Sequence, residues 1–175
     1  TAAIRTVEWA VTMGTLYGAV NAVKSMVTTS SAIYDQMNSI QMVTGASNSE
    51  ISSMLTTYQE IASTLSSTTS QVAASAEVWL RQGRSIADTN SLIETTTVLS
   101  KVGFMDSATS AQMLTSAING YKISAEDAMS VVDKMSAIDV AAATSTEDLA
   151  IAMSKTASGA KIAGVSMDEL LSYIA

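Results

Sequence analysis

The 175-residue chain contains no histidine, no cysteine and no proline. Without histidine and cysteine it has no Ser-His-Asp triad, no cysteine nucleophile and none of the usual ligands of zinc, haem or iron–sulfur clusters. Proline interrupts helices, so its absence favours a chain that is helical nearly throughout. These absences predict an all-α protein and exclude the catalytic and metal sites that depend on histidine or cysteine. The sequence also shows no convergent set of metal ligands and no glycine-rich phosphate loop, so we expect no catalytic site, no metal site and no cofactor.

Charge and aromatic side chains are also scarce. Charged residues make up 14% of the chain, against a usual share of about 25%, and aromatic residues make up 5%. The net charge of −7 and the acidic isoelectric point argue against specific nucleic-acid binding. Small residues are abundant instead: the chain has 27 serines, 21 threonines and 27 alanines.

The most informative pattern is a recurring helix-start signal. A Ser or Thr followed three residues later by an acid or Gln forms a capping box, in which each side chain bonds a free backbone N–H of the first turn. Asp106 serves as the N-cap at the one place where such a box is missing. The predicted N-caps are Ser47, Thr68, Ser85, Asp106, Ser124, Ser145 and Ser166.

The spacing of these caps predicts paired helices. Successive caps are 21, 17, 21, 18, 21 and 21 residues apart, so every second cap is 38 or 39 residues on until a final step of 42. We expect an all-α fold in which a long apolar N-terminal helix over residues 1–46 precedes residues 47–175. That region is predicted to be an array of short antiparallel helical hairpins with a period of about 39 residues. The predicted helices span 48–65, 69–82, 86–102, 107–119, 125–138, 146–158 and 167–175.

Glycines occupy matching places in the first three helix pairs. Gly83 and Gly120 are predicted to close the second helix of two pairs, and Gly159 lies at the corresponding place in the third. Glycine just past a helix adopts the left-handed conformation that other residues resist.

The N-terminal region has a different character. The stretch 6–23, between Arg5 and Lys24, is the strongest candidate for a membrane segment, although the alternative of a bundle or oligomer-interface helix is favoured because polar residues dilute it. Gly14 and Gly18 form a small-xxx-small pair that would let another helix, or a membrane partner, approach closely. Threonine at position 1 leads us to expect an excerpt of a longer protein.

Neither the paired acids nor the methionines require a ligand. Each acidic pair falls in the first turn of a predicted helix, where free N–H groups and the helix dipole favour negative charge. The methionines fall mostly at helix-core spacing, so packing accounts for them. The acidic pairs are Glu126-Asp127, Glu147-Asp148 and Asp168-Glu169.

The order of several short segments resembles the core region of phage tail tape measure proteins. The likeness rests on residues 99–106 (LSKVGFMD), 124–128 (SAEDA), 145–150 (STEDLA) and 160–170 (AKIAGVSMDEL), and it covers about residues 45–175. In that family an alanine-rich helix leads to a Gly-apolar-Ser turn and then to an acidic helix start.

The resemblance implies a structural function without catalytic residues. A tape measure protein sets tail length by templating tail-tube assembly in the tube lumen, and it is released ahead of DNA during infection. The implied partners are the tail tube protein, tail chaperones and baseplate or distal tail proteins. The resemblance also implies a homo-oligomer of a few copies of the chain, often three, and contact with the host membrane at ejection. The implied locations are the tail lumen of the virion and, during assembly, the cytoplasm of the infected bacterium.

Two other functions stay open on the sequence. A helical-repeat adaptor would bind a protein partner on a concave face. A membrane-active helical protein would insert through residues 6–23.

Overall fold

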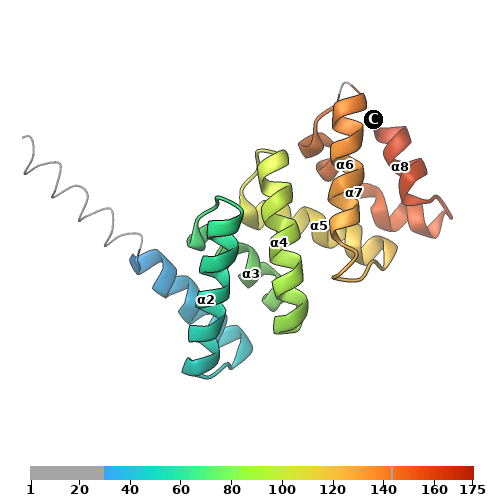
Figure 1. Cartoon of the computed structure of the whole chain (residues 1–175). Coiled ribbons are helices and arrows are strands. Elements are labelled where there is room, and N and C mark those ends of the chain that lie inside the picture. Colours follow the sequence, from blue (N-terminus) through green and yellow to red (C-terminus); the bar gives the residue numbers. More distant parts are fainter. Residues whose placement is uncertain (1–29, 143) are drawn as a thin grey trace, which may run out of the picture. The chain divides into compact units, whose positions relative to one another are not determined.

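In a computed structural model, residues 30–142 and 144–175 can be described (Figure 1). Every regular element in these two ranges is an α-helix, which confirms the all-α class. The chain divides into two compact units, Thr1–Asp35 and Gln36–Ala175. The helical array lies in the second unit.

Residues 30–44 are helical, and seven further helices follow along the described part of the chain. They are α2 (Asn48–Thr64), α3 (Thr69–Arg81), α4 (Ile86–Val102), α5 (Ser107–Tyr121), α6 (Met129–Ala141), α7 (Thr146–Ile162) and α8 (Met167–Ile174). The sequence prediction differs most at α6, which begins four residues later than expected, and at α7, which continues past Gly159.

The helix over residues 30–44 contacts the array through its residues in the second unit. Ser39 Oγ donates a hydrogen bond to Glu77 Oε1 of α3 at 2.6 Å, and Ser70 Oγ of α3 donates to Gln36 Oε1 at 3.1 Å. Met37 and Ile40 are buried. The second compact unit therefore begins at Gln36, ahead of the boundary between residues 46 and 47 that the sequence suggests.

The helices contact one another in two series. The second helices of the pairs pack in succession, α3 on α5 and α5 on α7, and the α5–α7 contact is the most extensive among the described helices. The first helices are connected more weakly, α4 to α6 and α6 to α8. Each pair is also closed within itself, α2 on α3, α4 on α5 and α6 on α7.

The buried positions repeat from pair to pair when they are counted from the N-caps predicted in the sequence, with Ser124 as the reference for α6. In α3, α5 and α7 the fifth, eighth and twelfth residues after the cap are buried in all three helices. In α2, α4 and α6 the seventh and eleventh are buried in all three. The second-helix set is Ala73, Ala76, Leu80, Ala111, Leu114, Ile118, Ala150, Met153 and Ala157, and the first-helix set is Met54, Tyr58, Leu92, Thr96, Val131 and Met135.

Threonines enter this core because their hydroxyls bond to their own helix. Thr96 and Thr97 donate to the carbonyls of Leu92 and Ile93, four residues earlier, at 2.6 and 2.7 Å. Thr96 Oγ1 also accepts from the indole N–H of the fully buried Trp79 at 3.0 Å. Thr96 and Thr97 thus bury their hydroxyl groups without losing their hydrogen bonds, whereas the buried hydroxyls of Thr89 and Ser107 have no partner within the described residues.

Two of the three helix-closing glycines lie inside helices instead. Gly83 takes the left-handed conformation (φ +80°) just past α3, as predicted. Gly120 lies within α5, where Lys122 is the left-handed residue at the end, and Gly159 lies within α7. A Cβ added at Gly120 would be 2.9 Å from Ala157 Cβ and 3.1 Å from the Ala157 backbone carbon. Gly120 is thus required for the close approach of α7, not for a turn.

The two equivalent glycines should respond oppositely to the same substitution. We expect Gly120→Ala to lower the free energy of unfolding by about 1–3 kcal/mol, because the α7 backbone leaves no room for the methyl group. Gly159→Ala meets nothing within 4 Å and should raise that free energy by up to about 1 kcal/mol through helix propensity. Urea denaturation of both variants checks this, and equal effects would contradict it.

Candidate functional site

At three of the predicted N-caps, side chains form a full capping box at the start of the helix. Ser47 Oγ accepts from the Glu50 N–H at 3.3 Å, and Glu50 Oε2 accepts from the Ser47 N–H at 2.8 Å. Thr68 and Ser166 make the same reciprocal pairs with Gln71 and Glu169. The side chains of Ser85, Asp106 and Ser145 accept from the backbone N–H three residues on.

Ser124 does not cap α6, and this corrects the prediction. Its Oγ accepts from the Asp127 N–H at 3.2 Å, but residues 125–128 form a turn and not the start of the helix. The turn is held by bonds between residues three apart, such as Ala128 N–H to Ala125 O at 3.4 Å. The helix begins only at Met129, behind Ala128, which has no side-chain cap.

The helix ends repeat a second device. At five helix ends one residue is left-handed, and the residue directly after it donates its N–H to the carbonyl five residues earlier. The five N–H groups belong to Ser67, Arg84, Met105, Ile123 and Val165. The left-handed residues are Ser66, Gly83, Phe104, Lys122 and Gly164, and Gly45 is left-handed before α2.

The left-handed end of one helix and the N-cap of the next are joined in links that share one three-residue form. A left-handed residue, one further residue and the cap residue follow each other, as in Gly83-Arg84-Ser85. The N-cap half of this link was visible in the sequence. The C-terminal half was predicted at Gly83, but it was missed at Ser66, Phe104 and Lys122, because these residue types carry no such signal.

Four carboxylates in these links have a lowered pKa and are held in the charged form. Hydrogen bonds from the backbone N–H and hydroxyl of Ser47 lower the pKa of Glu50, and those of Ser166 do the same for Glu169. The Thr109 hydroxyl and N–H lower the pKa of Asp106. At the α6–α7 link, Asp139 Oδ2 accepts from the Thr146 hydroxyl at 2.7 Å and N–H at 3.0 Å, which lowers its pKa.

The acidic pairs do not converge on a ligand site. Glu147 and Asp148 lie in the first turn of α7, and Asp168 and Glu169 in that of α8. Within residues 30–142 and 144–175, no three acidic side chains are grouped as a metal ion would require. Across the same ranges, no helix combines the length and apolar character needed to cross a membrane. Gly14, Gly18 and the stretch 6–23 lie outside the described residues.

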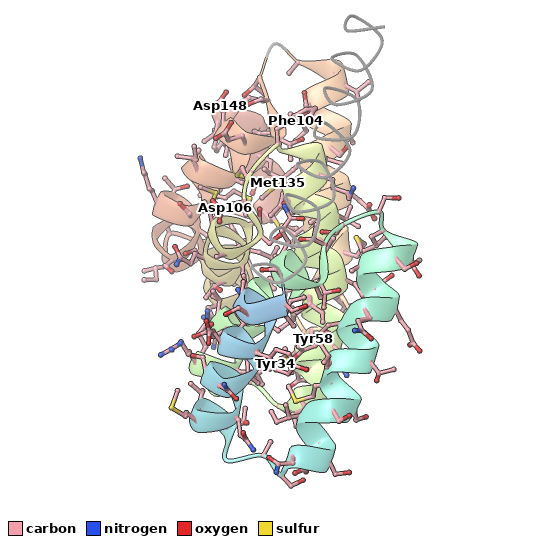
Figure 2. All side chains as sticks on the ribbon, turned by 90° about the vertical axis from the view of Figure 1, so that its left-hand side faces the viewer. Tyr34, Tyr58, Phe104, Asp106, Met135 and Asp148 are labelled. Carbon is pink, nitrogen blue, oxygen red and sulfur yellow. The ribbon has the colours of Figure 1, made fainter. Side chains whose placement is uncertain are left out.

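The most unusual exposed side chain belongs to Phe104. It is 95% exposed and has φ +52°, a conformation that costs a bulky residue energy. Figure 2 shows it toward the same end of the view as Asp148 of α7. The end of α4 before Phe104 and the start of α7 are neighbours, because a Cβ added at Gly103 would lie 3.7 Å from the backbone nitrogen of Glu147.

Phe104 borders an open groove of about 490 Å³ between two links. Lys101 lines this groove, and its Nζ donates a hydrogen bond to Ser66 O at 2.9 Å. The groove is lined by Ser66, Ser67, Gln71, Ser100, Lys101, Phe104 and Met105. It offers an aromatic surface and hydroxyl groups for contact with another molecule, and its lining has no acid–base pair suited to catalysis.

The described residues thus define a helical-repeat protein whose distinctive features are its links and its helix contacts. A family model described as "Phage-related minor tail protein" matches residues 56–175. The chain therefore belongs to the phage-related minor tail protein family and has a structural role in a phage tail, within the virion. No solved structure gives a significant match to it.

Replacing Phe104 should stabilise the protein. In Phe104→Gly the left-handed backbone is no longer strained, and almost no buried area is lost, so we expect a gain of roughly 1–2 kcal/mol in the free energy of unfolding. Phe104→Asn should give a smaller gain, because Asn tolerates this conformation less well than Gly. Thermal denaturation of the three proteins checks the order, and a loss of stability in both variants would refute it.

The capping carboxylates should make stability depend on acid pH. A carboxyl whose pKa is lowered by folding stabilises the native state above its unfolded pKa, and this contribution disappears as the pH falls through the folded pKa. We expect the unfolding temperature to be level down to about pH 4.5 and to fall progressively below it. Asp106→Asn retains a good N-cap without the titration and should flatten part of this decline. A pH series by circular dichroism tests it, and an unchanged slope would count against the role of Asp106.

Proposed function

We propose that this chain is part of a tape measure protein, which sets the length of the tail while the tail tube assembles around it. Membership of the minor tail protein family supports the tail location. The finer assignment rests on the resemblance of residues 45–175 to tape measure cores and on the repeating architecture. The mechanism needs no catalytic residue, and we infer that this region is not an enzyme.

The observation that carries the proposal is the uniform link. Because α2, α3, α4, α5, α7 and α8 each begin at a side-chain cap, and most links have the same three-residue form, one helix pair can be added or removed without rebuilding its neighbours. A gauge requires this property, since its length must change in steps while its local structure stays the same. An enzyme or a single-ligand binder has no need of it.

Slim helices also suit a narrow channel. Small residues meet where α5 crosses α7, at Gly120 and Ala157, so these two helices approach closely. Alanine, serine and threonine bury little apolar area, at about 25 cal/mol per Å², and helices held this way separate readily. In the proposed mechanism the packed region opens into an extended helix when the tail tube assembles around it, and the protein is later released ahead of DNA.

The partners follow from this assignment. The tail tube protein would polymerise around the chain, tail chaperones would keep it soluble before assembly, and baseplate or distal tail proteins would hold its end. Copies of the chain would associate as a homo-oligomer, a trimer in the related proteins. Contact with the host membrane would occur at ejection. Assembly takes place in the cytoplasm of the infected bacterium, and the final location is the tail lumen.

Deleting one helix pair from the phage-borne protein tests the proposal. Removal of residues 85–123, the 39 residues from one cap to the residue before the next, joins Arg84 directly to Ser124 and preserves the link. At 1.5 Å per residue in an extended helix, we expect tails shorter by about 58 Å in electron micrographs. The matched control replaces 85–123 with a second copy of 47–84, which should leave the tail length within about one helix turn of the original. Tails of unchanged length after the deletion would refute the gauge function.

A further inference from the structure

The ends of α3, α5 and α7 lie side by side in the array. Arg84 follows the left-handed residue at the end of α3, and its Nη2 donates a hydrogen bond to Asn119 Oδ1 of α5 at 2.8 Å. Lys161 of α7 lies over the ring of Tyr121 at the end of α5, with Nζ 5.7 Å from the ring centroid. These contacts join the three helix ends into one edge that runs from pair to pair.

Each of these helix ends carries one cation at the same position, the sixteenth residue after its N-cap. The three cations, which we call the basic edge, are Arg84, Lys122 and Lys161. Lys122 and Lys161 are exposed, and Arg84 is half-buried. Within residues 30–142 and 144–175, no carboxylate forms an ion pair with any of the three. The chain has only nine basic residues and a net charge of −7, so a row of three unpaired cations does not follow from its composition.

A polar groove lies at the first of these cations. It has a volume of about 550 Å³ and lies between the end of α3 and α5. Two of its lining residues bond to each other, because Gln82 Nε2 donates to Thr115 Oγ1 at 3.0 Å. None of the described residues that line it is acidic: they are Gln82, Gly83, Arg84, Thr115 and Asn119.

The hydrogen-bond donors of this groove fit a carboxylate. Asn119 takes up one N–H of the Arg84 guanidinium, which leaves the others as donors. The side-chain amides of Gln82 and Asn119 carry further N–H groups. A carboxylate accepts two N–H groups of one guanidinium at once, and this is the strongest contact that such a set of donors offers.

We propose that the basic edge is the docking surface for an extended acidic segment of another protein, whose carboxylates each meet one cation and whose first carboxylate occupies the groove at Arg84. The spacing of the helices fixes the kind of segment. Packed helices lie about 8–10 Å apart, and three residues of an extended chain span about 10 Å. A segment with an acid at every third residue therefore places one carboxylate at each helix pair.

Charge complementarity identifies the occupant. The unpaired cations favour a partner that carries negative charge on separate side chains. The net charge of −7 disfavours a nucleic acid, whose continuous phosphate backbone would be repelled by the rest of the chain. The proposal does not depend on the tape measure function.

A designed peptide tests the proposal with the 175-residue chain. The spaced peptide repeats Gly-Ser-Glu three times, and the clustered peptide has the same composition with its three glutamates in succession. We expect the spaced peptide to bind about threefold or more tightly than the clustered one, because only its carboxylates reach all three cations. Fluorescence anisotropy at low ionic strength measures both affinities, and added salt should weaken the binding.

Matched substitutions decide which cations bind the peptide. Arg84→Gln should weaken binding of the spaced peptide about tenfold, and Lys122→Gln and Lys161→Gln about two- to fivefold each. Arg84→Lys should restore only part of the affinity, because Lys cannot form the bidentate pair. The control Lys155→Gln removes an exposed cation of α7 outside the basic edge and should leave binding unchanged.

Circular dichroism checks that each variant is folded, and the two lysine variants of the basic edge carry the test if Arg84→Gln does not fold. The proposal is overturned if the spaced peptide does not bind, if the two peptides bind equally, or if Lys155→Gln weakens binding as much as Lys122→Gln. It is also overturned if single-stranded DNA binds the same edge more tightly than the peptide. Loss of a concentration-dependent oligomer in the variants of the basic edge would overturn it as well, because the occupant would then be a second copy of the chain.

Discussion

The structure depends on how the chain satisfies its backbone hydrogen bonds between helices. Each helix leaves N–H groups free at its start and carbonyls free at its end, and a buried group without a partner is costly. In most links these groups are satisfied within three residues, by one left-handed residue and one capping side chain. Since the link needs nothing from distant parts of the chain, helices can follow each other in an array, and packing only has to hold neighbours together.

The packing between neighbours is correspondingly economical. Trp79 and Tyr58 are the largest fully buried side chains, and the remaining core combines leucine, isoleucine, valine and methionine with alanines and with threonines such as Thr96 and Thr97, which bond to their own helix. Gly120 replaces side-chain volume with close backbone contact between α5 and α7. Such a core gives a specific arrangement without a large apolar area. This is consistent with a structural protein of the tail.

Much of the fold could be predicted because the capping chemistry is local. A hydroxyl followed three residues later by an acid or Gln reports a helix start wherever it occurs, and Ser47, Thr68 and Ser166 form full boxes. The same signal failed at Ser124, where the hydrogen bond forms but a turn follows it. The left-handed ends at Ser66, Phe104 and Lys122 could not be foreseen, because these residue types favour other conformations and are held there by the carbonyls of the preceding helix.

By itself the sequence determined the helical class, the positions of most helix starts and the absence of histidine and cysteine chemistry, because each depends only on residue type and short spacing. Tertiary structure alone decided which glycine is a turn and which a helix crossing. Gly83 and Gly120 occupy similar places in the sequence pattern, but only Gly120 has another helix against it. It also decided that Phe104 is exposed while the chemically similar Trp79 is buried. Such differences depend on contacts between residues far apart in the chain, which no local spacing encodes.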